Sequence, residues 1–388
     1  MKVYEIATGY TSVPAKIGAA TEIVVEQLCR ALLERDIPVE IVDMADRDRV
    51  GCGLPIREVA VPAWLSGTDA SLGIRHKLKR VVYSICLARE LNKLLRSCEE
   101  DTVLHFHNQY NLFFFLLLTP RHLRRRALIS YTNHSGIWRL PWEEIRGTIR
   151  KRYFQEAGCM KQADVVFVLN EETAENAKCR LGIPEERLRL IGNGVNTDIY
   201  SPLPLDKIEE SKGKWGLSGK SVILQAGSVC ENKGQRRAVE ALAPMLKEDR
   251  NLVYVYAGGI VSQEYHAQVQ ETARQLGVEQ QVHYLGTVSP GEEMNRLYNL
   301  ASVTVLFSRY EGFPLVAAES LSAGVPVVTP FSIGPGCTGT VEDALGRREE
   351  LSRAARKYAL EHLTWDAVAG EYRKIWEECL CRKSSTAR

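Results

Sequence analysis

The chain has 388 residues, of which 45% are hydrophobic and 25% are charged, and it carries a formal net charge of +2. A chain of this length is predicted to fold as two domains, because single cores rarely grow beyond about 250 to 300 residues. The ten cysteines are scattered and form no CxxC pair, which argues against a disulfide framework and against a zinc site. We therefore expect a cytoplasmic protein with reduced thiols, no bound metal and no nucleic-acid partner.

The first part of the chain alternates between expected strands and helices. Residues 2–8 are predicted as a strand, 19–35 as a helix and 39–43 as a second strand, which together form a β-loop-α-β unit. The loop lacks the GxGxxG pattern of a dinucleotide-dependent dehydrogenase. It places Gly18 at the start of the helix, where backbone amides could bind a phosphate or a substrate oxygen. An ordinary tight turn would favour the same small residues.

Residues 75–152 form a basic segment, with 16 Lys and Arg against 6 Asp and Glu. Such a face could contact anionic lipid headgroups, to which each basic residue contributes on the order of 1 kcal/mol. A solvated basic face, or one that attracts an anionic acceptor, explains the charge equally well. The apolar run at 112–118 is too short for a membrane span. We therefore expect at most a peripheral position at the inner face of the membrane.

Three histidines stand at the ends of two expected strands. His105 and His107 end the strand at 103–108, and His134 follows a strand that begins at residue 127. The mouth of a parallel strand is a position from which side chains contact bound substrates. A lone histidine is more often a packing residue, so we expect a function for His134 and a structural or acceptor-side place for the other two.

A boundary between the two domains is expected at residues 193–217. Beyond it, residues 220–246 repeat the order strand, loop and helix. Gly227 allows the chain to turn, and Lys233 stands beside Gly234 at the start of the expected helix. An ammonium group and free backbone amides thus converge where a pyrophosphate would lie.

The segment SRYEGFPLVAAESLSAGVPVVTP, at 308–330, carries two carboxylates at a fixed spacing. An apolar strand expected at 303–307 precedes it, so Glu311 lies just after a strand, and Leu315 to Ala323 is predicted as a helix. Seven residues separate Glu311 from Glu319, so only a long ligand could bridge the two. The backbone amides expected to face such a ligand belong to Gly312, Phe313 and Leu315.

The pattern EGFPLVAAE followed by AGVPVV resembles the E-x7-E signature of the retaining, nucleotide-sugar-dependent glycosyltransferases of the GT-B fold. The resemblance covers nearly the whole chain and is strongest over residues 190–330. It implies an α/β fold of two doubly wound, Rossmann-like domains that face each other across a cleft. The implied parts are an acceptor-side domain at 1–192, a hinge and linker at 193–217, a nucleotide-sugar-binding domain at 218–365, and at 366–388 a closing helix that crosses back to the first domain, with the tail.

The resemblance implies transfer of a sugar from a nucleoside diphosphate sugar to an acceptor hydroxyl, with retention at the anomeric carbon and with no metal or other cofactor. The implied catalytic residues are His134, which contacts the donor sugar, Lys233, which binds the diphosphate, and Glu311, which holds sugar hydroxyls. Glu319 would hold the ribose. The implied donor-binding residues are Gly18, Ser228, Lys233, Thr287, Glu311, Gly312, Phe313, Leu315 and Glu319, and the implied acceptor-side residues are Lys16, His107 and Asn133.

The chain departs from the family pattern in two places. Most members have an Arg directly after the glycine that corresponds to Gly227, and this chain has Ser228, so one cation for the leaving group is missing. Arg236 or Arg237 would compensate only if its side chain faces the loop. Residues 331–345 reach the next helix quickly, so we expect the edge of the sheet and part of the donor-pocket rim to be missing.

Two other functions stay open. A non-catalytic nucleotide-sugar-binding protein with a degraded site would explain Ser228, and it predicts donor binding without transfer or hydrolysis. A sugar-nucleotide epimerase of the same architecture would need acid and base carboxylates in the cleft and would lack the E-x7-E helix. The acceptor class is open among cell-surface glycans, glycolipids and glycosylated metabolites.

Overall fold

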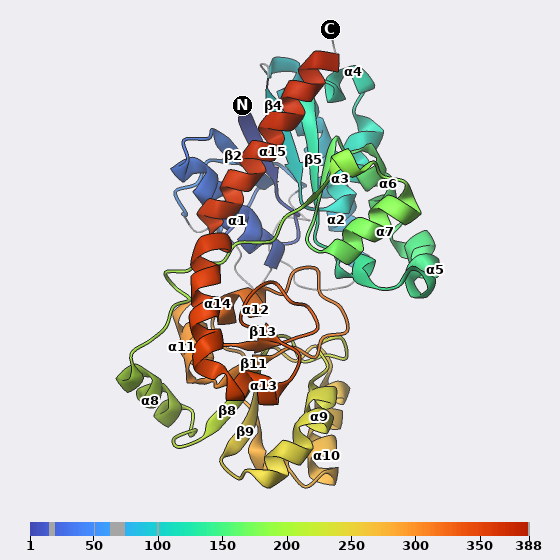
Figure 1. The fold of residues 1–388 in the computed structure, drawn as a ribbon. Helices are drawn as coiled ribbons and strands as arrows, with labels where there is room; N and C mark the ends of the chain where they lie inside the picture. Colours follow the sequence, from blue (N-terminus) through green and yellow to red (C-terminus); the bar gives the residue numbers. More distant parts are fainter. Residues whose placement is uncertain (15–19, 50, 63–73, 99–100, 387–388) are drawn as a thin grey trace. The chain divides into compact units, whose positions relative to one another are not determined.

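The computed structural model of the protein describes residues 1–388 except 15–19, 50, 63–73, 99–100 and 387–388. Its contacts divide the chain into two compact units (Figure 1). Unit 1 consists of Met1–Gly194 together with Trp365–Arg388, and unit 2 consists of Val195–Thr364. Each unit is a parallel β-sheet with helices on its faces, which confirms the expected pair of doubly wound α/β domains.

Unit 1 contains a parallel sheet whose described strands run in the order β3-β2-β1-β4-β5-β6-β7. The order reverses between β1 and β4, and in sheets of this kind ligands bind at the carboxyl ends of the strands beside such a reversal. The strands are β1 (Lys2–Ile6), β2 (Val39–Met44), β3 (Ile56–Val59), β4 (Thr102–Phe106), β5 (Ala127–Asn133), β6 (Val165–Val168) and β7 (Leu188–Leu190).

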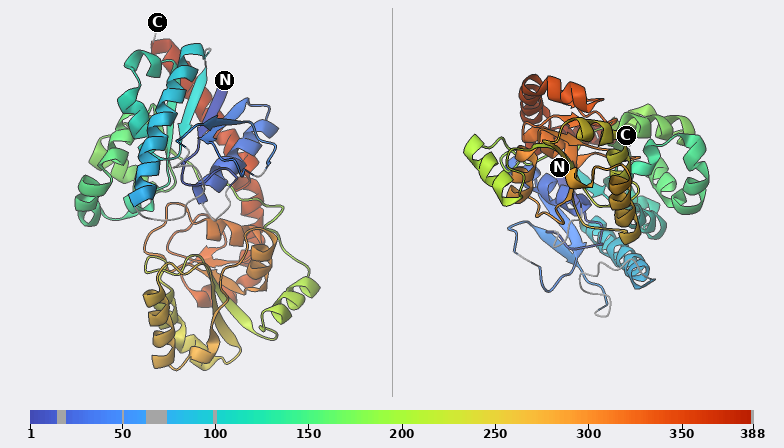
Figure 2. Two further views of the ribbon diagram at one scale, coloured as in Figure 1. Left: turned by 180° about the vertical axis from the view of Figure 1, so that it is seen from behind. Right: turned by 90° about the horizontal axis from the view of Figure 1, so that it is seen from below.

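Helices cover both faces of this sheet, so its central strands β1, β2, β4, β5 and β6 are almost completely buried. One face packs against α1 and α15, and the other packs against α2, α3 and α6. The left view of Figure 2, turned by 180° from Figure 1, shows the second face. The helices are α1 (Ala20–Glu34), α2 (Ile74–Ser97), α3 (Gln109–Leu118), α4 (Arg121–Arg124), α5 (Trp142–Arg152), α6 (Phe154–Gln162), α7 (Glu171–Leu181) and α15 (Trp365–Thr386), with short 3-10 turns at Gly136–Arg139 and Glu185–Arg187.

The closing helix α15 belongs to unit 1 and lies along its sheet (Figure 1). Val368, Tyr372 and Trp376 recur every four residues and are buried in the unit 1 core. The indole Nε1 of Trp376 also donates a hydrogen bond to Ser130 Oγ on β5, at 3.0 Å. In the described part of the chain, no helix has both the length and the apolar character needed to cross a bilayer.

Unit 2 has described strands in the order β10-β9-β8-β11-β12-β13, which reverses between β8 and β11. The strands are β8 (Ser221–Ala226), β9 (Leu252–Ala257), β10 (Val282–Tyr284), β11 (Val303–Val305), β12 (Val327–Val328) and β13 (Cys337–Thr338). The helices are α8 (Leu205–Lys214), α9 (Gln235–Glu248), α10 (Gln263–Gln275), α11 (Glu292–Leu300), α12 (Leu315–Ser322), α13 (Val341–Gly346) and α14 (Arg348–His362), with a 3-10 turn at Glu279–Gln281.

The expectation that residues 331–345 leave the sheet without its edge is wrong. Strand β13 lies in this segment and pairs with β12, with Cys337 beside Val327. Gly336 makes the return possible, because its φ is 97° and an added Cβ would lie 2.6 Å from Ala355 on α14. The short segment therefore still completes the edge of the sheet.

Candidate functional site

Loops that follow three neighbouring strands of unit 2 lock together at the carboxyl edge of its sheet. The amide of Val229 donates to the carbonyl of Gly259 at 2.9 Å, and the amide of Gly258 donates to that of Gly286 at 2.8 Å. Gly258 has a φ of 147°, and an added Cβ would lie 2.1 Å from the carbonyl oxygen of Gly227. Only glycine allows the loops after β8 and β9 to approach this closely.

Lys233 and Glu311 meet at the same edge. Lys233 ends the loop after β8 and Glu311 lies in the loop after β11, and the Lys233 Nζ is 2.6 Å from the Glu311 Oε1. The amide of Arg309 donates to the carbonyl of Asn232 at 2.8 Å and ties the two loops together. The structure thus brings together the residue predicted to bind a diphosphate and the residue predicted to hold sugar hydroxyls. A lysine ammonium has three donors, so Lys233 can bind Glu311 and an anion together.

Glu319 lies on α12, half-buried beside two tyrosines. The Tyr298 hydroxyl donates to Glu319 Oε2 at 2.7 Å. Burial raises the pKa of Glu319 to about 7, because the hydrogen bonds from Tyr298 and Tyr200 offset only part of the desolvation cost. Among the residues that the structure describes, no Lys or Arg forms an ion pair with this carboxylate. Further hydroxyl donors from a ligand would lower the pKa of Glu319 and favour its ionised form.

The missing arginine has a candidate replacement. Ser228 is exposed and carries no charge. The Arg237 Nη2 donates to the carbonyl of Phe307 at 2.6 Å, and an added Cβ on Gly234 would lie 2.7 Å from that nitrogen. Arg236 instead lies 4.0 Å from Glu240 along α9. Of the two arginines, Arg237 is thus the one that faces the loops around Lys233.

The other residues predicted to bind the donor differ in their exposure and in the hydrogen bonds that they already form. The amide of Leu315 donates to the carbonyl of Phe313 at 3.0 Å and is therefore already occupied. Thr287 is exposed, beside Gly259 in the interlocked loops. Gly312 precedes Phe313 and Leu315 in the loop that carries Glu311. The predicted residues Gly18 and Lys16 lie outside the described residues.

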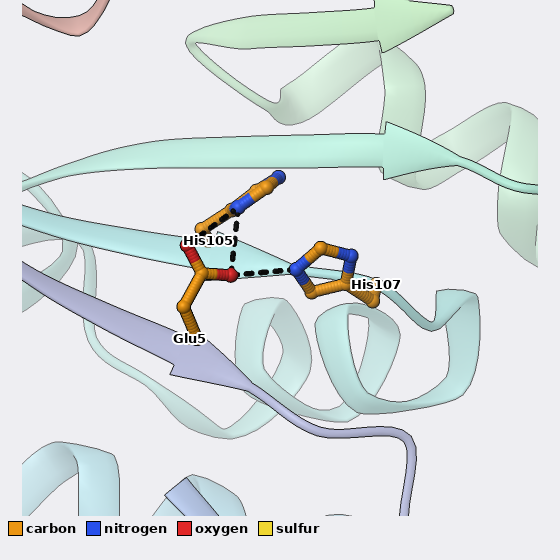
Figure 3. Close-up of side chains that lie close together, drawn as sticks. All are labelled: Glu5, His105 and His107. Carbon is orange, nitrogen blue, oxygen red and sulfur yellow. Dashed lines mark hydrogen bonds and ion pairs between the residues drawn. The ribbon is translucent and has the colours of Figure 1, made fainter. Parts of the chain in front are cut away.

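In unit 1, four side chains from the ends of β1, β4 and β5 form a hydrogen-bonded chain. The Glu5 Oε2 lies 2.9 Å from His105 Nδ1 and 2.6 Å from His107 Nε2 (Figure 3). The other ring nitrogen of His107, Nδ1, lies 3.0 Å from His134 Nε2. The Glu5, His105 and His107 side chains are completely buried, and the half-buried His134 ends the chain.

The charges of these groups follow from their burial. Burial raises the pKa of Glu5, but the electrostatic interaction with His105 and the hydrogen bonds from both imidazoles outweigh it and lower that pKa to about 2. Burial and the electrostatic interaction with His105 lower the pKa of His107 to about 4. Burial and the two other histidines lower the pKa of His134 well below its usual value. At neutral pH, Glu5 is therefore ionised and both His107 and His134 are neutral.

Glu5, His105 and His107 are also side chains of the kind that bind metal ions, and they are the one such group found in the described part of the chain. Two ligand atoms around a tetrahedral zinc ion lie about 3.3 Å apart. The 2.6 and 2.9 Å separations between Glu5 and the two histidines are shorter than this and fit hydrogen bonds.

Burial revises the acceptor-side prediction for two residues. The His107 side chain is completely buried, and Asn133 is 2% exposed, so neither lies where an acceptor could contact it. The Asn133 Oδ1 instead accepts a hydrogen bond from the amide of Ser135 at 3.2 Å. Sequence reasoning also missed Glu5, although an acidic residue inside a buried strand is a usable signal.

A second feature that the sequence did not reveal is an arginine that lies close to two aromatic rings. The Arg80 guanidinium lies 4.4 Å from the ring centre of Tyr10 and 4.1 Å from that of Tyr110. Lys151 and Phe154 line the same cleft. A guanidinium that lies over aromatic rings still has N–H groups that can bind an anion.

Two family models match the chain. One, described as Glycosyl transferases group 1, matches residues 207–345, and the other, described as Glycosyltransferase Family 4, matches residues 21–199. An uncharacterised glycosyltransferase of Methanocaldococcus jannaschii is 28% identical over 238 residues, which are 55% of this chain and 59% of that protein. A D-inositol 3-phosphate glycosyltransferase of Corynebacterium glutamicum is 23% identical over 254 residues, which are 59% of this chain and 60% of that protein. The match thus spans about three fifths of the length of these relatives.

Solved structures resemble the whole chain. The sucrose-phosphate synthase of Thermosynechococcus elongatus matches with a TM-score of 0.73 and 17% identity, over 98% of this chain and 100% of that one. Anabaena HepE in complex with UDP and glucose matches with a TM-score of 0.67 and 15% identity, over 97% of this chain and 100% of that one. At these identities, the likeness establishes the fold.

Proposed function

Because the chain belongs to the group 1 glycosyltransferases of the GT-B fold, we propose that it transfers a sugar from a nucleoside diphosphate sugar to an acceptor hydroxyl. We further propose that the reaction retains the configuration at the anomeric carbon and needs no metal ion. The observation that carries the proposal is the Lys233–Glu311 pair at the carboxyl edge of the unit 2 sheet. The complex of the similar Anabaena protein with UDP and glucose supports the same donor class.

Each group at this edge has a part in donor binding. Lys233 binds the diphosphate and stabilises the negative charge that develops on it as the bond to the sugar breaks. Arg237 supplies the second positive charge in place of Ser228. Glu311 accepts hydrogen bonds from sugar hydroxyls, and ionised Glu319 accepts them from the ribose. In unit 1, His134 contacts the transferred sugar.

The cleft around Arg80 favours an anionic acceptor. Arg80 offers the N–H groups of its guanidinium, and Lys151, which lines the same cleft, adds a second cation. A phosphate group matches this arrangement, because guanidinium groups bind phosphate oxygens with paired hydrogen bonds. The name of the Corynebacterium relative also specifies a phosphorylated acceptor. The phosphate can belong to a soluble metabolite or to a lipid headgroup, and the second source would also explain the basic segment at 75–152.

A second candidate function is nucleotide-sugar binding without transfer, and Ser228 is the observation that favours it. Thermal unfolding with UDP, GDP, ADP and dTDP, each alone and as sugar conjugates, tests the donor site common to both functions. A ligand present at 100 times its dissociation constant should stabilise unit 2 by about 2.7 kcal/mol. Release of free nucleoside diphosphate from the stabilising donor then separates transfer from binding. A wild-type protein that none of these ligands stabilises would rule out both functions.

A further inference from the structure

We propose that Glu5 and His107 are positioning residues that hold His134 in a single tautomer, with its Nε2 protonated and its Nδ1 free to accept a hydrogen bond from a hydroxyl of the transferred sugar. The inference rests on the proposed function in one respect, which is that His134 contacts the sugar. The tautomer itself follows from unit 1 alone.

The charge of the Glu5 carboxylate determines the direction of each hydrogen bond from Glu5 through His107 to His134. An ionised carboxylate can only accept hydrogen bonds, so the His107 Nε2 that lies 2.6 Å from Glu5 must carry a proton. His107 is neutral, which leaves its Nδ1 without a proton. That nitrogen lies 3.0 Å from His134 Nε2, and it can only accept. His134 must therefore donate through Nε2–H.

The same rule defines the free atom of His134. A neutral imidazole with a proton on Nε2 has a lone pair on Nδ1. Among the described residues, Nδ1 of His134 has no hydrogen-bond partner. The His134 side chain is half-buried, whereas that of His107 is completely buried. Nδ1 can then accept a hydrogen bond from a neutral hydroxyl. A carboxylate at the same place has no proton to donate, and its lone pairs would repel the lone pair of Nδ1. This arrangement therefore favours a sugar that presents a neutral hydroxyl to His134 Nδ1 over one that presents a carboxylate there.

His105 provides a matched control because it contacts the same carboxylate without touching His134. Its Nδ1 lies 2.9 Å from Glu5, and its Nε2 lies 2.7 Å from the Thr132 hydroxyl. The hydroxyl oxygens of Thr132 and Tyr372 lie 3.1 Å apart, so this arm leads into the core. Replacing either histidine by leucine leaves Glu5 with one donor fewer, but only His107→Leu removes the acceptor of His134 Nε2–H.

The first test is the imidazole NMR spectrum of the protein labelled with 15N-histidine, with the His134 signals assigned by their loss in His134→Gln. We expect a protected His134 Nε2–H proton and an unprotonated Nδ1 at pH 7. His107→Gln should retain the protected proton, because glutamine offers both a donor and an acceptor, and His107→Leu should lose it. A proton on Nδ1 of His134 in the wild type would overturn the inference, as would stoichiometric metal in the purified protein, since a metal ion would replace the protons of these hydrogen bonds.

The second test compares transfer rates from the stabilising donor. We expect kcat/KM to fall about tenfold more in His107→Leu than in His105→Leu at similar loss of thermal stability, with recovery in His107→Gln, because one hydrogen bond between neutral groups is worth about that factor. Equal losses in the two leucine variants would make the role purely structural and would overturn the inference. A wild type with the predicted tautomer but no transfer would instead refute the proposed function and leave the tautomer established.

Discussion

The Lys233 ammonium and the Glu311 carboxylate lie 2.6 Å apart in unit 2, so the cation and the anion of the candidate donor site neutralise each other. Both side chains are largely shielded, with 27% of Lys233 and 12% of Glu311 exposed. A diphosphate that approaches Lys233 therefore meets Glu311 as well. If Glu311 holds the sugar as proposed, binding and catalysis place opposite demands on this carboxylate, because it would repel the phosphate and hold the sugar.

The opposite demands predict opposite effects of Glu311→Gln on two measurements. Affinity for free UDP, or for whichever nucleoside diphosphate stabilises the protein, should rise severalfold, because a nearby negative charge is removed. Transfer should fall by about 100-fold or more, the loss expected when one preorganised polar contact to the transition state is removed. Titration calorimetry and a nucleotide-release assay measure the two quantities. Lys233→Ala, the control, should weaken nucleotide binding, and unchanged affinity in that variant would place the diphosphate elsewhere.

Arg237→Ala should lower the affinity for the same nucleoside diphosphate by about tenfold, because a charge-assisted hydrogen bond to phosphate is lost. Arg236→Ala is the matched control on the same helix, and its affinity should stay near that of the wild type since Arg236 lies toward Glu240. Calorimetry with both variants at one salt concentration makes the comparison. If the two substitutions weaken binding equally, the effect is general electrostatics and Arg237 does not replace the missing arginine.

Glu319→Gln should change how stability depends on pH. The pKa of Glu319 is about 7 in the folded protein against an ordinary value of 4.5, so the folded state binds this proton more tightly. Stability from this group is therefore present below pH 4.5 and is lost as the pH rises through 7. Glutamine stays neutral, so the stability of the variant relative to that of the wild type should increase by on the order of 2 kcal/mol when the pH is raised from 5 to 8. Calorimetric unfolding at the two pH values measures the gain, and an equal difference between variant and wild type at both would refute the raised pKa.

Arg80→Gln should raise the KM for a phosphorylated acceptor by about tenfold and leave nucleotide affinity unchanged, because the lost contact is a charged hydrogen bond in unit 1. Arg89→Gln, an exposed position on the same helix, is the control and should behave as the wild type. Kinetics with soluble sugar phosphates and with vesicles that contain anionic lipid distinguish the two sources of the phosphate. An Arg80 variant with unaltered KM for both acceptors would exclude this cleft as the acceptor site.

The sequence was sufficient for the elements whose pattern is local. The apolar strand before Glu311 and the helix that carries Glu319 follow from hydrophobic spacing, and the structure has them at Val303–Val305 and Leu315–Ser322. The short strand β13 was not predicted, because two residues carry no period and the strand depends on how Gly336 packs against α14. A strand of that length is defined by its partner and not by its own sequence.

The candidate site could be predicted only as separate residues. The spacing of Glu311 and Lys233 in the chain gives no distance between them, and their ion pair forms because β8 and β11 are neighbours in the sheet. Glu5 and His107 are separated by about one hundred residues and meet through the pairing of β1 with β4. Contacts of this kind depend on strand order, which no local pattern in the sequence contains.

The most direct test of the central claim is a transfer assay with the stabilising nucleoside diphosphate sugar and a phosphorylated acceptor, in which proton NMR follows the anomeric signal of the product. We expect release of the nucleoside diphosphate together with a product of the same anomeric configuration as the donor, and loss of both in Glu311→Gln. Donor binding without any product across soluble and lipid acceptors would contradict the claim and favour a binding protein. A product of inverted configuration would contradict the proposed retention.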